Sequence, residues 1–126
     1  MKTKLKEKTT LIEFPVLRYI FCILVTNNIK ESYLKRYRYE YTNRIEPKAM
    51  FVNETGDKSG TIYLNFDACP EAISHECYHG VRAMQRSFTN ADIGNEEWEA
   101  YHLGYLVGKV HEFIEKGKRK RRASSK

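Results

Sequence analysis

The sequence lacks an apolar run long enough to cross a bilayer. Its longest, residues 16–25, has ten residues and is interrupted by Arg18, whereas a membrane-spanning helix needs about 20. Glu7 and Glu13 also leave no clean apolar segment ending in a small-residue cleavage site near the N-terminus. We therefore expect a cytoplasmic protein with no membrane contact.

Cysteine is scarce, and Cys22, Cys69 and Cys77 form an odd set without metal-finger spacing. Reduced thiols in a cytoplasmic setting are the simplest interpretation. Internal repeats are absent, and a content of 41% hydrophobic and 30% charged residues excludes wholesale disorder. At 126 residues the chain suits a single domain.

Positive charge is concentrated at the two ends of the chain. Residues 116–126 carry seven Lys or Arg and no acid, and residues 1–9 carry four Lys and one Glu. Residues 10–115 carry eleven bases and fifteen acids, so this part is mildly acidic although the whole chain is +6. We expect a flexible basic N-terminus over 1–10, a domain over 11–116 and a disordered basic tail over 117–126. The tail is a candidate for weak, salt-sensitive contact with nucleic acid.

Residue patterns predict an α+β domain with about three helices and a small, mostly antiparallel sheet of about three strands. Aromatic and β-branched residues indicate a strand at about 16–25, and two further β-like runs, 49–53 and 61–66, are joined by a turn with two glycines. The run 61–66 alternates apolar and polar residues, which is typical of a strand with one wet face. Helices are expected at about 28–38, 70–86 and 96–116, the last ending at Gly117.

The helix expected at 70–86 contains His75-Glu76-Cys77-Tyr78-His79, an H-E-x-x-H string. Four residues make just over one helical turn, so His75 and His79 project from one face and can bind the same zinc ion. Glu76 lies about 100° round the helix, beside the metal. From there it can take a proton from a zinc-bound water.

A catalytic zinc generally has three protein ligands, and the next helix carries Glu97 near its N-terminal end. The face of Glu97 continues through a row of mostly small residues, Ala100, Tyr101, Gly104 and Gly108. The preceding helix has a matching row, Ala72, Glu76, Gly80 and Ala83. If the two rows pack antiparallel, Glu97 approaches both histidines.

Other residues of the last helix are alternatives for the third ligand. Glu96 lies about 100° from Glu97, and its other role is a solvated acid that favours the helix N-terminus. His102 and His111 would complete a three-histidine site, but one falls on a different face and the other lies further along the helix. Both fit a structural or surface role better.

The segments ISHECYHG (73–80) and EEWEAYHLGY (96–105) resemble the small zincin-type metallopeptidases encoded by bacteriophages and prophages. In those proteins an H-E-x-x-H helix is followed by a helix with a Glu-Glu-x-x-Ala-Tyr-x-x-Gly pattern, similar to the gluzincins and the ImmA/IrrE-type peptidases. The resemblance covers about residues 48–115. It implies zinc ligands at His75, His79 and Glu97, a general base at Glu76, and the host cytoplasm as the location of a phage-encoded protein.

We therefore expect a zinc-dependent metallopeptidase-like hydrolase. The resemblance implies that a peptide substrate lies extended along an edge strand formed by Thr61–Phe66. Tyr101, one turn after Glu97, is either a hydrogen-bond donor to a developing oxyanion or a core tyrosine. The alternative function is a binding or structural phage protein that keeps this framework, with or without metal, and engages DNA or a protein through its basic termini.

Overall fold

A mixed sheet forms the centre of the fold. The computed structural model describes residues 4–15, 17–37, 48–54, 58–87 and 96–124, without the side chains of Tyr37, Glu96 and 119–124. Within these residues the sheet has four strands, β1 (Glu7–Phe14), β2 (Tyr19–Thr26), β3 (Ala49–Asn53) and β4 (Ser59–Asn65), in the order β1-β2-β4-β3. β2 and β4 are parallel, and the other two pairs are antiparallel. The expected α+β class is confirmed, with one strand more than predicted.

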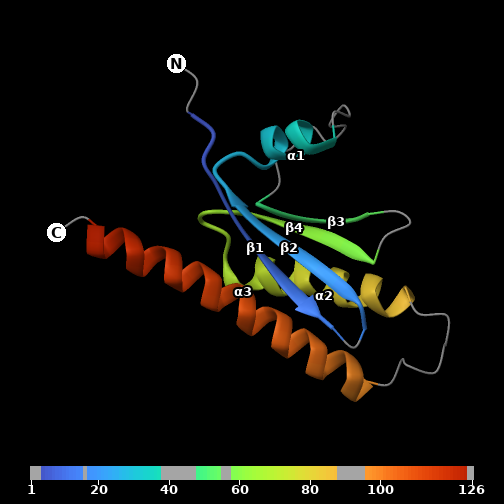
Figure 1. Cartoon of the computed structure of the whole chain (residues 1–126). Coiled ribbons are helices and arrows are strands. Elements are labelled where there is room, and N and C mark those ends of the chain that lie inside the picture. The colour runs from blue at the N-terminus through green and yellow to red at the C-terminus, as the bar shows by residue number, and fades with distance from the viewer. Residues whose placement is uncertain (1–3, 16, 38–47, 55–57, 88–95, 125–126) are drawn as a thin grey trace.

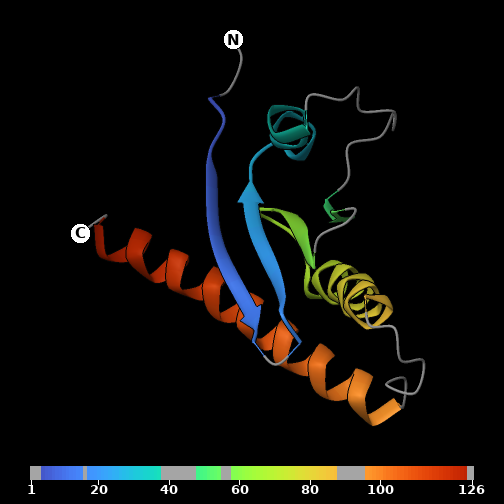
Figure 2. The ribbon, with the colours of Figure 1, turned by 45° about the vertical axis from the view of Figure 1, so that its right-hand side comes forward.

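Three helices cover both faces of the sheet. They are α1 (Ile29–Tyr37), α2 (Pro70–Arg86) and α3 (Glu96–Ser124). Figures 1 and 2 show α2 and α3 across one face and α1 near the other, with the C-terminal end of α3 extending past β1. Among the described residues no helix combines the length and the apolar character that a membrane crossing requires.

The larger core lies between the sheet and the helices α2 and α3. The buried positions of α2 recur at three- and four-residue steps, and they pack on side chains of β2 and β4. The fully or almost fully buried members of this cluster include Phe21, Ile23, Ile62, Leu64, Ile73, Cys77, Val81, Met84, Leu106 and Val110. Burial of each large aliphatic side chain stabilises the fold by about 1.5–3 kcal/mol, so this cluster fixes how α2 is rotated.

On the other face of the sheet, side chains of β4 are also buried. Ile29 of α1 forms a smaller cluster with Leu24 and Tyr63, and all three are buried. Thr61, on the same face of β4 as Tyr63, is fully buried too. The predicted wet face of 61–66 is therefore wrong, because α1 covers it.

Three predicted boundaries also differ from the structure. β1 begins at Glu7, so the flexible lead expected over 1–10 is wrong for its last four residues, which pair with β2. Arg18 has φ 54° in the turn before β2, and β2 begins at Tyr19 and not at residue 16. α3 runs past Gly117 to Ser124. The prediction of a disordered tail over 117–126 is therefore wrong for residues 117–124. Lys and Arg are good helix formers and are favoured at a helix C-terminus. Residues 1–3, 38–47 and 125–126 lie outside the described residues.

Replacing two glycines of these helices by alanine should change the free energy of unfolding in opposite directions. A Cβ on Gly80 would lie 2.7 Å from Cε1 of the buried Phe21 ring, whereas a Cβ on Gly104 would meet no atom within 4 Å. Overpacking should outweigh the helix-propensity gain in Gly80→Ala and lower the free energy of unfolding by about 1 kcal/mol. Gly104→Ala should raise it by up to about 1 kcal/mol. Urea denaturation of both variants measures the difference, and stabilisation by Gly80→Ala would contradict this packing.

Candidate functional site

α2 presents the H-E-x-x-H string on the outer surface of the molecule. Pro70 occupies the first turn, where its missing N–H costs no hydrogen bond, and Ser87 ends the helix with its N–H donating to the Ala83 carbonyl at 3.1 Å. The apolar side of α2 faces the sheet, so His75 and His79 are on the exposed side.

The two imidazoles of the string point to one place. His75 Nε2 and His79 Nε2 are 3.1 Å apart, and the ring planes are inclined at 79°. Two nitrogens bound to one tetrahedral zinc at about 2.0–2.1 Å are about 3.3 Å apart, so the pair is already close to the spacing of two shared metal ligands. The same distance also permits a hydrogen bond in which one Nε2–H donates to the other Nε2.

Glu76 stands between the exposed histidine face and the core. Its side chain is 14% exposed, and its Oε1 lies 4.0 Å from His75 Nε2. The carboxylate is thus next to the pair while the rest of the side chain is covered. This is the position that a general base acting beside the two histidines needs.

Cys77 lies on the opposite side of α2 from the histidines. Its side chain is fully buried in the larger core, and burial, followed by the nearby Glu76 charge, raises the pKa of its thiol to about 12. Because the thiolate is the metal-binding form, Cys77 does not compete with His75 and His79 for a metal.

α3 is rotated so that its row of small residues faces outward. Glu97 is exposed, Tyr101 is 72% exposed, and a Cβ on Gly104 or Gly108 would touch nothing within 4 Å. Leu106 and Val110 are fully buried instead. The predicted contact between two small-residue rows is therefore wrong, because the aliphatic stripe of α3 takes the buried side and Gly80 of α2 packs on Phe21.

Among the described side chains the acid of α3 that reaches α2 is Glu99. Its carboxylate accepts a hydrogen bond from Arg82 Nη1 at 2.7 Å, and its side chain is 22% exposed. This contact raises the pKa of the Arg82 guanidinium. Arg82 follows His79 by three residues, so it shares the histidine face of α2.

Sequence reasoning missed Glu99 although a signal for it was present. Glu99 precedes Leu103, Leu106 and Val110 at steps of four, three and four residues. That spacing places it on the aliphatic stripe of α3. The Glu-x-x-Ala pattern directed attention to Glu97, which lies about 160° away from Glu99 round the helix.

Within the described residues no group of three or more His, Cys, Asp or Glu is placed to hold a metal ion. Two expected ligands, His75 and His79, are together, and Glu97 is not grouped with them. The side chain of Glu96 and the whole segment 88–95 lie outside the described residues.

The two remaining histidines play no part in this pair. His102 Nδ1 donates a hydrogen bond to the Trp98 carbonyl at 2.7 Å, and its ring stacks on the Trp98 indole with centroids 4.1 Å apart. His111 is partly buried on α3. These contacts fit the structural role that the sequence favoured for His102.

The strand expected to guide an extended substrate is not at an edge. Thr61–Asn65 belongs to β4, which pairs with β2 on one side and β3 on the other, so the edge role predicted for Thr61–Phe66 is wrong. Among the described strands the edges are β1 and β3. β3 also contacts α2 and is therefore the edge strand on the side of the candidate site.

Comparisons of the chain with protein-family models, with curated proteins and with solved structures gave no match.

Thiol reactivity should separate the buried cysteine of the motif from the exposed one. Cys69 is exposed, whereas Cys77 is buried and its pKa of about 12 leaves almost no thiolate at pH 8. In the folded protein iodoacetamide should label Cys69 at least about 100-fold faster than Cys77. Cys77 should be labelled only after unfolding. Peptide mapping by mass spectrometry measures both sites, and comparable rates for the two cysteines in the native protein would contradict the burial of Cys77.

Proposed function

We propose that this chain is a zinc-dependent hydrolase that cleaves a peptide bond. The observation that carries the proposal is the 3.1 Å separation of His75 Nε2 and His79 Nε2 on an exposed helix face, with the Glu76 carboxylate beside them. Two imidazoles and an adjacent acid are the donor set and the base that such an enzyme uses.

His75 and His79 fit a zinc ion as two of its ligands. For the third ligand we propose Glu97, because of the Glu-x-x-Ala pattern. Glu99 is the alternative that the rotation of α3 favours, since its side chain already contacts the histidine face through Arg82. A bound zinc ion would supply Lewis-acid polarisation of the scissile carbonyl and would lower the pKa of a coordinated water.

Glu76 carries the proton-transfer steps of the proposal. Its carboxylate takes a proton from the attacking water and then delivers that proton to the leaving amine of the peptide. Because α2 is held by its buried face, Glu76 is positioned by the core and not by the substrate.

Two further assignments depend on the same site. Tyr101 would donate a hydrogen bond to the oxyanion only together with Glu97 as ligand, because the two residues lie one turn apart on one face of α3. An extended substrate would add to the outer edge of β3, which no described strand occupies and which is beside α2, and not to β4. Main-chain pairing of this kind gives affinity for peptides with little dependence on side chains.

Zinc binding should depend on the two histidines of α2 and not on those of α3. Purified wild-type protein loaded with zinc should retain about one ion per chain. His75→Ala and His79→Ala should each lower the zinc affinity at least about 100-fold. His111→Ala is the matched control and should bind as wild type, with competition against a chromogenic chelator as the measurement. Unchanged affinity in both α2 variants would mean that the 3.1 Å contact is only a hydrogen bond.

The same titration identifies the third ligand. Glu97→Gln weakens zinc binding if the pattern-based assignment is correct, and Glu99→Gln does so if the acid paired with Arg82 is the ligand.

Substitution of Glu76 should abolish hydrolysis without abolishing metal binding. Glu76→Gln keeps the size of the side chain and removes the base, so zinc affinity should stay within about threefold while peptide cleavage falls by about 10²–10⁴-fold. Cleavage of a quenched fluorescent peptide library by zinc-loaded protein measures the rate. If the wild-type protein bound zinc but cleaved no peptide, the proposed hydrolase activity would be wrong and only the proposed metal site would stand.

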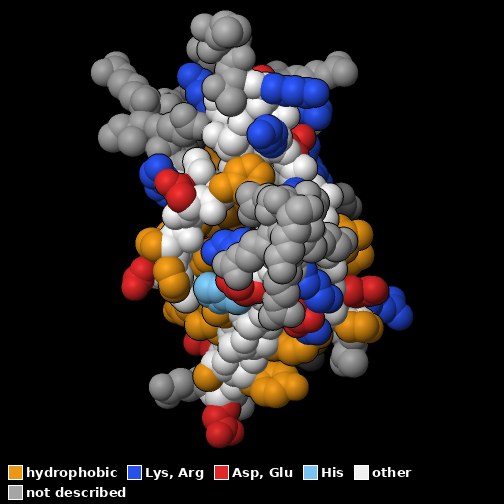
Figure 3. All heavy atoms as spheres, turned by 90° about the vertical axis from the view of Figure 1, so that its left-hand side faces the viewer, with side chains coloured by type: hydrophobic (Ala, Val, Ile, Leu, Met, Phe, Trp, Pro, Cys, Tyr) orange, Lys and Arg blue, Asp and Glu red, His pale blue; other side chains and the backbone are white. Residues whose placement is uncertain are grey.

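The alternative function, a binding protein that engages DNA or a protein, draws on one feature of the fold. α3 continues as a helix through 116–124, a stretch with six Lys or Arg and no acid. On the face in Figure 3 the described Lys and Arg side chains are interspersed with Asp and Glu. The hydrolase proposal draws on the more specific geometry, the 3.1 Å separation of His75 Nε2 and His79 Nε2 beside Glu76, and is therefore the better supported of the two.

A further inference from the structure

β1 has an open main-chain edge on the side of the sheet away from β3. Within the described residues it pairs only with β2. Asn27 N–H donates to the Lys6 carbonyl at 3.2 Å, and hydrogen-bonded pairs alternate along an antiparallel ladder. The even-numbered residues of β1 therefore bond to β2. The odd-numbered residues Thr9, Leu11 and Glu13 direct their N–H and C=O groups to the open side.

This edge lacks several of the features that block strand addition, although Glu7, Lys8 and Glu13 are charged. β1 has eight residues without Pro or Gly, and it keeps a regular register with β2 along its whole length. Leu11 at its middle is 68% exposed. A long, regular outer strand with an exposed apolar side chain is a template for another strand.

A groove lies along this edge between β1 and α3. Its volume is about 260 Å³, and it is lined by Thr10, Leu11, Ile12, Lys109, Glu112, Phe113 and Lys116. Phe113 supplies an apolar contact, and the charged residues come from α3. A strand added to β1 would therefore direct half of its side chains to this part of α3.

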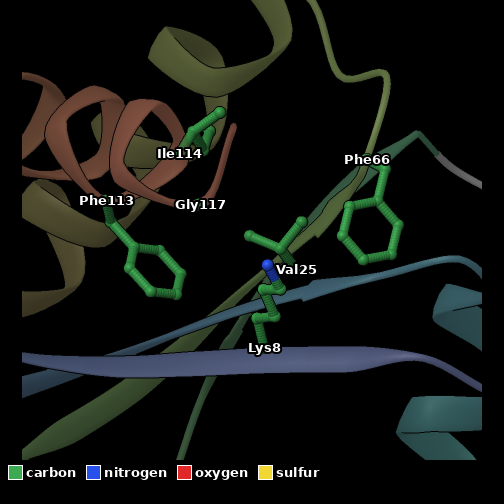
Figure 4. Close-up of a pocket in the computed structure, with 6 residues that line it drawn as sticks. All are labelled: Lys8, Val25, Phe66, Phe113, Ile114 and Gly117. Atoms are coloured by element: carbon green, nitrogen blue, oxygen red, sulfur yellow. The ribbon is translucent and has the colours of Figure 1, made fainter. Parts of the chain in front are cut away.

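The groove is positively charged. Among the described residues Glu112 is the only acid that lines it, and it is shared between Lys109 at 3.8 Å and Lys116 at 3.6 Å. Ion pairs this long between exposed side chains contribute little, so both amines can turn to a carboxylate of a ligand. Figure 4 shows Lys8 reaching from β1 toward α3 in a second pocket, which shares Phe113 with the groove.

We propose that the edge of β1 binds an extended acidic peptide as an added strand, with its carboxylates directed to Lys109 and Lys116. Main-chain hydrogen bonds from the odd-numbered residues of β1 would hold the peptide, and the lysines would select for acids. A second copy of this chain is less suitable, because two-fold pairing along β1 would bring the two sets of α3 lysines together. The site is on the opposite edge of the sheet from β3 and does not rest on the proposed hydrolase activity.

The main-chain part of this proposal can be tested with one matched pair of variants. A fluorescein-labelled nine-residue peptide of alternating Glu and Val, and a Lys/Val counterpart, are titrated into the full chain while fluorescence anisotropy is followed. Leu11→Pro removes one outward N–H without removing a β1–β2 hydrogen bond, and should weaken binding of the acidic peptide at least about tenfold. Leu11→Ala keeps that N–H and should bind within about threefold of wild type.

The charge part uses the double variant Lys109→Glu/Lys116→Glu. It should lose affinity for the acidic peptide at least about tenfold and gain affinity for the basic one. Wild-type binding should also weaken as salt is raised.

Three results would overturn the proposal. The first is equal affinity of the wild-type protein for the acidic and the basic peptide. The second is that folded Leu11→Pro binds the acidic peptide as tightly as Leu11→Ala does. The third is that the wild-type protein sediments as a dimer and that Leu11→Pro dissociates this dimer. If thermal unfolding shows that Leu11→Pro is not folded, the charge-reversed variant decides, and unchanged affinity for the acidic peptide overturns the proposal.

Discussion

The apolar contact between α2 and the sheet determines where the chemically active groups of this chain lie. Ile73, Val81 and Met84 are buried in one cluster with side chains of β2 and β4, and each contributes about 1.5–3 kcal/mol. An exposed ion pair such as Arg82–Glu99 contributes about 0–1 kcal/mol, so the core sets the rotation of α2. That rotation places His75 and His79 together on the outside and Cys77 inside.

Much of this arrangement can be predicted from the sequence because it depends on strong local patterns. Pro70, the three- and four-residue spacing of apolar residues and the H-E-x-x-H string define α2 and its histidine face without any long-range information. The same holds for α1, β3 and β4, whose predicted ranges agree with the structure to within about two residues. These elements are short, and their limits are marked by turn or capping residues.

The parts that sequence reasoning missed depend on pairing between distant segments. The beginning of β1, Glu-Lys-Thr-Thr, is polar, and only its ladder with β2 makes it a strand. The burial of Thr61 and Tyr63 depends on α1, which lies about 30 residues earlier in the chain. α3 has two rows at helical spacing, and the pattern alone does not say which one is buried. Leu106 and Val110 decide it, because burying them stabilises far more than burying glycine.

The rotation of α3 about its axis determines which acid near its N-terminal end faces α2. It also determines whether Lys109 and Lys116 face the groove beside β1. Glu97 and Glu99 lie about 160° apart round the helix, so turning Glu97 toward His75 and His79 by rotating all of α3 would expose Leu106 and Val110. It would also turn Lys109 and Lys116 away from the groove beside β1. Loss of the two aliphatic contacts alone would cost about 3–6 kcal/mol, and the same rotation would also break the Arg82–Glu99 pair. If Glu97 is a ligand, it must therefore reach the histidines through a change confined to the first turn of α3, with the rest of the helix held in place.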